Sequence, residues 1–271
     1  MNIIYLASSF IAIFILFYSY QKLTNPEVFA EKKSNIIKNK KIILTIPTYL
    51  DFPDEDKWEC LYTAIDSILY HEPHIKAFID FYVINEYCEN PREDWKTKVT
   101  QKYPFVTFIQ KTSDLKGYEN TLNIILDLIK THVYWIHLEE SWYSIRPFIM
   151  DAMHIMDNSK ITQLQFSKVL DGTKYGRTDW IEKVIETNCH RIPRYNNYCM
   201  ISNTETDTKP LYSLRPSINR VKDYNFGKFN VSDKFETEFG ERWMKKNYVK
   251  AIIMEGSAAR KMTHVSCFNN R

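Results

Sequence analysis

The sequence places two carboxylates, Glu139 and Glu140, directly after an apolar segment at 134–138. That segment is rich in aromatic and β-branched residues, which is typical of a buried strand. Open α/β sheets bind ligands in the crevice outside the carboxyl ends of their strands. Two acids at such a point indicate a catalytic or metal-binding role. An ordinary acidic turn after a strand is the alternative.

Upstream of these acids, buried-strand patterns alternate with amphipathic helical patterns. The strands are expected at 41–49, 77–87, 105–110 and 134–138, and the helices at 57–70, 91–103 and 117–130. Pro91 and the acids that follow it mark the start of the second helix. Short strands joined by helices of this length favour a parallel sheet with right-handed crossovers. The sequence therefore predicts an α/β fold with a mostly parallel central sheet flanked by helices.

Composition and motifs exclude several function classes. The formal charge is only +3, and no basic stripe is interleaved with aromatic residues, so no nucleic-acid partner is expected. Neither a G-x-G-x-x-G turn nor a phosphate-binding-loop lysine motif is present, which argues against dinucleotide-binding and NTP-hydrolysing proteins. The five cysteines have no C-x-x-C spacing, so neither a zinc site nor a disulfide framework is indicated, although a luminal domain could hold one or two bridges.

The N-terminal segment reads as a membrane anchor. Residues 1–21 carry no charged side chain and are almost entirely apolar, long enough to cross a bilayer as a helix. A cleaved signal peptide fits less well, because a basic start and a small-residue cleavage site are missing. A lysine-rich linker follows at 22–39, and the positive-inside rule then favours a cytoplasmic globular domain at 40–271.

Four motifs in the first half carry a resemblance to a known family. They are IPTY at 46–49, TAIDSIL at 63–69, K-G-x-x-x-x-x-N at 116–123 and WIHLEESW at 135–142. Downstream, YSLRPSINR at 212–220, FETEFGERW at 235–243 and a late histidine follow in order. Over roughly residues 40–268 the chain resembles GT-A fold (Rossmann-like) glycosyltransferases, in particular the family-2-like nucleotide-diphospho-sugar transferases of bacteria and large DNA viruses.

The resemblance implies a binding site for a UDP- or GDP-sugar donor, built from strand ends and from the loop before the helix at 117–130. Lys116 would supply charge to the diphosphate, and Gly117 would allow close backbone approach. Taken singly, each position also has a purely structural explanation. The donor-binding residues implied are Pro47, Thr48, Tyr49, Asn85, Glu86, Lys116, Gly117, Asn123 and Arg215.

The resemblance also implies a divalent metal, Mn²⁺ or Mg²⁺, but the acidic motif departs from the family. Relatives commonly end this motif in an aspartate that binds the metal, whereas Ser141 stands at that position here. On an extended backbone Glu139 and Ser141 would face one side and Glu140 the other. The implied ligands are Glu139, Glu140 and His264. If they bind metal weakly, Lys116, Arg215 and Arg220 are candidates to neutralise the leaving diphosphate.

An inverting sugar transfer needs a carboxylate to take the proton from the acceptor hydroxyl. By position in the family-like motif, Glu238 is favoured as this base, with Glu236 second, while a solvated acidic helix start is the alternative. The sequence thus predicts a membrane-anchored hexosyltransferase acting on a glycan or protein acceptor. The alternatives are an inactive relative that binds nucleotide or glycan, and a nucleotidyltransferase.

Overall fold

The computed structural model describes residues 41–51, 57–166, 190–192, 195–202, 215–224, 227–229, 241, 249–253 and 259–261. The chain divides into two units, Met1–Lys40 and Lys41–Arg271, and every described residue belongs to the second. Within the described part, no helix is long and apolar enough to span a bilayer. The predicted anchor at 1–21 and the linker at 22–39 lie outside that part.

A mixed sheet forms the centre of the fold, and nine of the described strands belong to it in the order β3-β2-β1-β4-β9-β6-β10-β8-β7. Among these, β8 and β9 run opposite to the rest. The predicted α/β class with a mostly parallel sheet is therefore confirmed. The bounds are β1 (Ile42–Thr48), β2 (Ile79–Asn85), β3 (Val106–Gln110), β4 (Tyr134–His137), β6 (Ile161–Gln165), β7 (His190–Ile192), β8 (Tyr195–Ser202), β9 (Ser217–Arg220) and β10 (Val249–Ile253).

A small second sheet pairs β5 (Trp142–Ser144) with β11 (Ala259–Lys261) in antiparallel fashion. It follows directly after the acidic segment that ends β4. Short 3₁₀ turns connect other elements: η1 (Pro73–Ala77), η2 (Ser113–Leu115) and η4 (Val221–Asp223).

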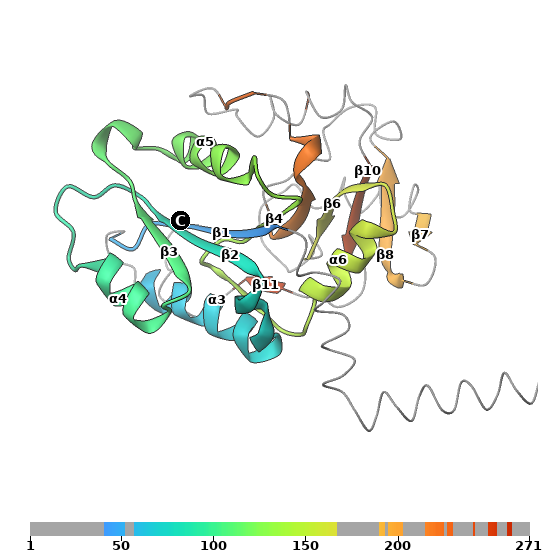
Figure 1. The fold of residues 1–271 in the computed structure, drawn as a ribbon, viewed down its shortest axis with the longest axis horizontal. Helices are drawn as coiled ribbons and strands as arrows, with labels where there is room; N and C mark the ends of the chain where they lie inside the picture. The colour runs from blue at the N-terminus through green and yellow to red at the C-terminus, as the bar shows by residue number, and fades with distance from the viewer. Residues whose placement is uncertain are drawn as a thin grey trace, which may run out of the picture. The chain divides into compact units, whose positions relative to one another are not determined.

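Helices cover both faces of the sheet (Figure 1). On one face lies α5 (Tyr118–Ile129), whose Leu122, Ile125 and Ile129 pack against Ile43 of β1 and Trp135 of β4. On the other face lie α3 (Lys57–His71) and α4 (Trp95–Lys102), with α6 (Ile149–Asp157) further along the sheet. Because both faces are covered, every residue of β1 is buried, as is usual for a central parallel strand.

The helix predicted at 91–103 begins later than expected, at Trp95. Asp94 is its N-cap, since the carboxylate accepts hydrogen bonds from the backbone N–H and the hydroxyl of Thr97. An N-cap aspartate satisfies donors that the first turn leaves open. Pro91 therefore precedes the helix and does not start it.

A buried acid joins two distant parts of this scaffold. Glu72, at the end of α3, is 2% exposed, and its carboxylate accepts hydrogen bonds from the backbone N–H groups of Phe148, Ile149 and Met150. These are the first N–H groups of α6, which have no partner within the helix. The carboxylate also complements the positive end of the helix dipole.

On α3 itself, Cys60 is disulfide-bonded, a bridge that cysteine spacing did not indicate.

Candidate functional site

The carboxyl ends of β1, β2, β3 and β4 meet at one edge of the sheet. Thr48 lies opposite Asn85 and Asn85 opposite Gln110, while Thr45 lies opposite His137 of β4. The chain runs outward from β1 to β2 and β3 and then returns to β4 on the other side of β1. This reversal is a topological switch point, where open α/β sheets form a ligand crevice. The predicted residues at the strand ends therefore share one edge.

The end of β1 contributes three of the predicted donor-binding residues. Pro47 and Thr48 are buried, and Tyr49 is half-buried. Among the described residues, the buried Oγ1 of Thr48 has no hydrogen-bond partner. The pKa of the Tyr49 phenol is raised, first by burial and then by the negative charges of Cys88, Asp51 and Glu86. Tyr49 and Glu86 thus belong to the same local patch.

Asn85 ties neighbouring strand ends together. Its Oδ1 accepts a hydrogen bond from the backbone N–H of Leu50 at 2.9 Å. Its Nδ2 donates to Oε1 of Gln110 at 2.8 Å. The side chain is completely buried, so these bonds fix how the chain leaves β1 and where β3 ends. A contact between Asn85 and a nucleobase stays a prediction.

Glu86 is held by a buried lysine that the sequence patterns did not single out. The Nζ of Lys111 lies 2.8 Å from Oε2 of Glu86, 2.6 Å from the Gly117 carbonyl and 2.8 Å from Oγ1 of Thr121. The lysine side chain is completely buried, and that of Glu86 is 17% exposed. Burial lowers the pKa of Lys111, while the Glu86 carboxylate opposes that shift. One ammonium therefore links the ends of β2 and β3 to the start of α5.

Gly117 has a backbone conformation that other residues rarely adopt. Its φ is 101° and its ψ is 151°, a region occupied almost only by glycine. Its N–H points at Oε1 of Glu86, 3.4 Å away, and its carbonyl accepts from Lys111. The side chain of Lys116, just before it, is exposed to solvent. The structure thus places Lys116 and Gly117 at the N-terminus of α5, next to the carboxylates of Glu86 and Glu119, and their contact with a donor stays a prediction.

The acidic segment forms a turn, so the extended backbone expected for it is wrong. The N–H of Trp142 donates to the carbonyl of Glu139 at 3.1 Å, which closes a four-residue turn. The Trp142 indole also donates to Oε2 of Glu139 at 3.1 Å. Glu140 pairs with Lys57 at 3.2 Å, with both side chains largely buried. Ser141 is 6% exposed. Because residues 139–142 form a turn that leads directly into β5, their side chains do not point to alternate sides as they would on an extended strand.

These contacts bear on the predicted metal site. Both carboxylates have protein partners, and the described residues contain no group of three histidine, cysteine or acidic side chains that could hold a metal ion. The third predicted ligand, His264, lies outside the described residues. Mg²⁺ is usually held by only one or two carboxylates together with waters and substrate phosphates, so the predicted metal site stays a prediction.

Asn123 and Arg220 have structural contacts. The Asn123 amide donates to the Phe229 carbonyl at 3.1 Å and accepts from the Phe229 N–H at 2.8 Å, so it holds the 227–229 segment against α5. The Arg220 guanidinium donates to the carbonyls of Met156, Ser159 and Ile161 and satisfies the C-terminal end of α6. Arg220 is therefore used within the protein, which removes it as a candidate for neutralising a diphosphate.

The described residues do not test the predicted roles of Arg215, Glu236 and Glu238. Arg215 is half-buried before β9, and its predicted donor contact stays a prediction. The two base candidates, Glu236 and Glu238, lie outside the described residues, and Glu241 is exposed. Their roles stay predictions.

A row of buried polar side chains crosses the face of the sheet on which α5 lies. His137 of β4 lies opposite Ser217 of β9, which lies opposite Gln165 of β6. Two residues away along the same strands, Asn219 of β9 and Gln163 of β6 occupy the same face of the sheet, and their side chains are hydrogen-bonded at 2.9 Å. All five are 1% exposed. A polar row inside a sheet core is costly unless it is hydrogen-bonded.

Within the described structure, neither ring nitrogen of His137 has a hydrogen-bond partner, and the same holds for the Gln165 amide. Burial lowers the pKa of His137 to about 3, so its imidazole is neutral near pH 7. The residue lies two positions before Glu139 at the switch-point edge. Sequence reasoning missed it because His137 stands within an apolar strand pattern, although its place just before the acids was a usable signal.

Comparison with known proteins supports the fold assignment. TarS of S. aureus (residues 1–349) superposes with a TM-score of 0.58 and 12% identity, covering 82% of this chain and 60% of TarS. GalNAc-T7, solved with UDP, GalNAc and Mn²⁺, superposes with a TM-score of 0.56 and 8% identity, covering 85% of this chain and 45% of its own. These neighbours are GT-A-type glycosyltransferases, so the chain has the fold of nucleotide-sugar glycosyltransferases.

Sequence comparison alone does not show a family. No protein-family model matches the chain. A ferredoxin–NADP reductase of Staphylococcus saprophyticus is 23% identical over 195 residues, covering 67% of this chain. The chain spans about half of that reductase, 53% of its length. Because the chain lacks the G-x-G-x-x-G turn typical of dinucleotide sites, this weak similarity carries no functional argument.

Replacing Lys111 tests its role at the sheet edge. We expect Lys111→Met to lower the free energy of unfolding by about 3 kcal/mol, because it leaves a largely buried Glu86 carboxylate without its cation. The double variant Lys111→Met/Glu86→Gln should recover part of the loss. Lys116→Met, at an exposed position nearby, should change stability by less than about 0.5 kcal/mol. Urea unfolding measures all three, and a Lys111→Met variant as stable as the wild type contradicts this role.

His137 predicts a specific pH dependence. Because its folded pKa is about 3, below the unfolded value of 6.5, the unfolded state binds a proton first as the pH falls. Its contribution to stability is constant above pH 6.5 and declines between pH 6.5 and 3. Between pH 7.5 and 5, His137→Phe should therefore lose about 2 kcal/mol less unfolding free energy than the wild type. The exposed His74→Phe is the control, and an equal pH dependence in wild type and His137→Phe is the contrary result.

Proposed function

We propose that this protein transfers a sugar from a nucleoside-diphosphate donor to an acceptor hydroxyl. The observation that carries the proposal is the switch point between β1 and β4, where Thr48, the Glu86–Lys111–Gly117 cluster and the acidic turn meet at one edge of the sheet. Such an edge is where ligands bind in open α/β sheets.

The residues at this edge suit a nucleoside diphosphate. The exposed Lys116 ammonium and the first N–H groups of α5 offer positive charge and donors to the diphosphate. Gly117 adopts a conformation that glycine favours, and it thereby sets the direction of the first N–H groups of α5. Lys111 does not take part directly, because its three contacts are all internal; it fixes the position of Gly117 instead.

The donor nucleotide to test first is UDP. TarS has been crystallised with UDP and with UDP-GlcNAc, and GalNAc-T7 with UDP. These chains share the fold at 8–13% identity, which supports a nucleotide-sugar donor without specifying the sugar. A GDP-sugar is the other donor that we propose to test.

The reaction further needs a base, for which we propose Glu238, with Glu236 as second choice. Its carboxylate would take the acceptor proton while the diphosphate leaves from the opposite face of the sugar, with inversion. We propose a glycan or protein hydroxyl as acceptor and a membrane anchor at residues 1–21. We also propose a divalent metal, Mn²⁺ or Mg²⁺, which Glu139, Glu140 and His264 would hold and which would neutralise charge on the leaving diphosphate. GalNAc-T7, which shares the fold, was solved with Mn²⁺.

The donor site is tested by titrating UDP calorimetrically into wild type and two lysine variants. Lys116→Ala should weaken UDP binding roughly tenfold or more, the scale of one charge-assisted hydrogen bond. Lys130→Ala, at the other end of α5, should leave affinity unchanged. A parallel titration with Mn²⁺, in wild type and Glu140→Ala, shows whether metal contributes. Failure of UDP and GDP to bind, or equal losses in both lysine variants, contradicts the proposed donor site.

The base is tested by turnover. If Glu238 takes the acceptor proton, Glu238→Gln should cut release of the nucleoside diphosphate by about two to four orders of magnitude while donor affinity stays close to wild type. Glu236→Gln is the matched control and should be milder. Wild-type protein that binds UDP but turns over no donor would instead identify an inactive binding protein. Full activity in Glu238→Gln would move the role to another acid.

A further inference from the structure

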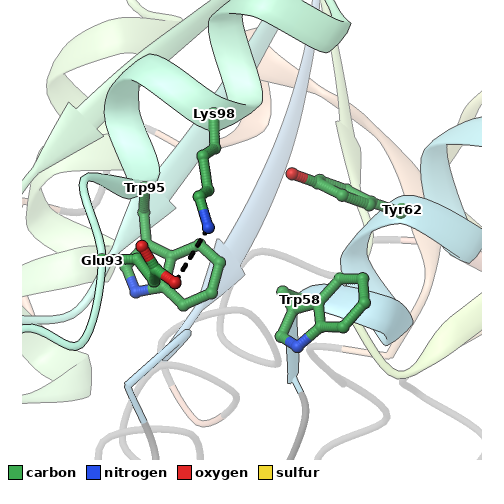
Figure 2. A pocket seen from close by; sticks show the side chains of 5 residues that line it. All are labelled: Trp58, Tyr62, Glu93, Trp95 and Lys98. Carbon is green, nitrogen blue, oxygen red and sulfur yellow. Dashed lines mark ion pairs between the residues drawn. The ribbon is translucent and has the colours of Figure 1, made fainter.

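A cavity lies between α3 and α4, near the segment that follows β1. It has a volume of about 330 Å³ and is lined by Trp58, Tyr62, Glu93, Trp95 and Lys98. Trp58 and Tyr62 come from the first turns of α3, and the other three come from the start of α4 and the residues before it (Figure 2). Its volume is at the small end for ligand sites, which suits a single ring and not a whole nucleotide sugar.

The aromatic walls are held in fixed positions. The Trp95 indole donates to Oδ1 of the buried Asp51 at 2.8 Å, and Trp95 is only 6% exposed. Trp58 and Tyr62 pack edge to face, with ring centroids 5.7 Å apart. In Figure 2 the Tyr62 hydroxyl points across the gap toward Lys98 and Trp95. The cavity is therefore lined by aromatic side chains from both helices, with a hydroxyl and a charged pair at its rim. The Lys98 ammonium lies over the Trp95 ring, 5.5 Å from its centroid, so Trp58 offers the more open aromatic face.

The charges around the cavity favour a neutral ligand. Lys98 pairs with Glu93 at 2.9 Å, and both side chains are about half exposed. Lys102, which lies over the Tyr62 ring, pairs with Asp66 at 2.9 Å. Each of these cations is thus balanced by a carboxylate, so a phosphate would meet as much negative as positive charge. A nucleotide is a poor fit for this cavity.

The charged pair at the rim also favours a sugar over an apolar side chain as the ligand. An apolar side chain from another protein would cover the Glu93–Lys98 pair without offering it hydrogen bonds, which costs free energy. A sugar ring presents C–H groups to aromatic faces and hydroxyls to a carboxylate and an ammonium. The weakly positive C–H groups suit the negative face of an aromatic ring.

The cavity is joined to the acidic turn through α3. Lys57, next to Trp58 in the chain, forms the ion pair with Glu140 at 3.2 Å. The first turn of α3 therefore contacts the acidic turn and also supplies a wall of the cavity.

We propose that this cavity binds a non-reacting saccharide unit of a glycan acceptor. The inference rests on the proposed transferase function for the choice of an acceptor, whereas the binding of a neutral sugar rests on the cavity alone. Binding energy from such a remote unit can be used to position the reacting hydroxyl.

The test uses neutral trisaccharides of glucose, mannose and N-acetylglucosamine as probes, without nucleotide. Saturation-transfer NMR detects binding to the full chain, and a titration gives the affinity. We expect at least one trisaccharide to bind, Trp58→Ala to weaken it at least tenfold, and Glu93→Ala to weaken it severalfold. The matched control is Tyr70→Ala, because Tyr70 is also on α3 but is 83% exposed and outside the cavity. Thermal melting checks that each variant is folded.

Several results would overturn the proposal. The first is that the wild type binds none of the trisaccharides, and the second is that Trp58→Ala and Glu93→Ala both bind sugar as well as the wild type does. The third is that Tyr70→Ala weakens binding as much as the cavity variants do. The fourth is that an aromatic peptide binds at Trp58 although no sugar does. UDP titrated into the same samples separates the two proposals. If UDP binds and no sugar binds, only the proposal for the cavity is contradicted. If a sugar binds and neither UDP nor GDP binds, only the proposed donor site is contradicted.

Discussion

A completely buried ammonium, that of Lys111, organises the edge of the sheet on which the proposed function depends. It is bound to Glu86 after β2, to the Gly117 carbonyl before α5 and to Thr121 inside α5, while its own backbone follows β3. Burying a charge is costly, and the cost is met only if the charge is paired and fully hydrogen-bonded. Three segments are therefore constrained at once. Gly117 can hold its glycine-only conformation because its N–H and its carbonyl both have partners in this cluster.

The order of the strands determines where this edge of the sheet lies. The chain leaves the fully buried β1 on one side to form β2 and β3 and returns on the other side to form β4. The acidic turn then lies next to the end of β1, and Lys57 of α3 holds it there through Glu140. Beneath the turn, the row containing His137, Ser217 and Gln165 keeps polar groups inside the sheet at a position where apolar residues would give a more stable core. Buried polar groups without a partner, as at His137 and Gln165 within the described structure, are rare in folded proteins and call for an explanation.

Much of the fold could be predicted from the sequence, because strand and helix periods are local signals. The strands at β1, β2, β3 and β4 and the start of α5 after Gly117 are confirmed. The start of α4 was misjudged because Asp94, and not Pro91, provides the cap. Lys111 was missed because its partner Glu86 is 25 residues away and the segment around it reads as a polar loop. The turn at Glu139–Trp142 depends on an indole contact and an ion pair with α3, neither of which a strand pattern reveals.

The central claim is that a nucleoside diphosphate binds over the β1–β4 switch point. A crystal structure of the protein soaked with UDP tests this most directly, because it locates the phosphates relative to named atoms. We predict the diphosphate within hydrogen-bond distance of the Lys116 ammonium and the first N–H groups of α5, with the uracil near Tyr49 and Glu86. UDP bound in the α3–α4 cavity, or at any position away from the carboxyl ends of β1 and β4, would contradict it.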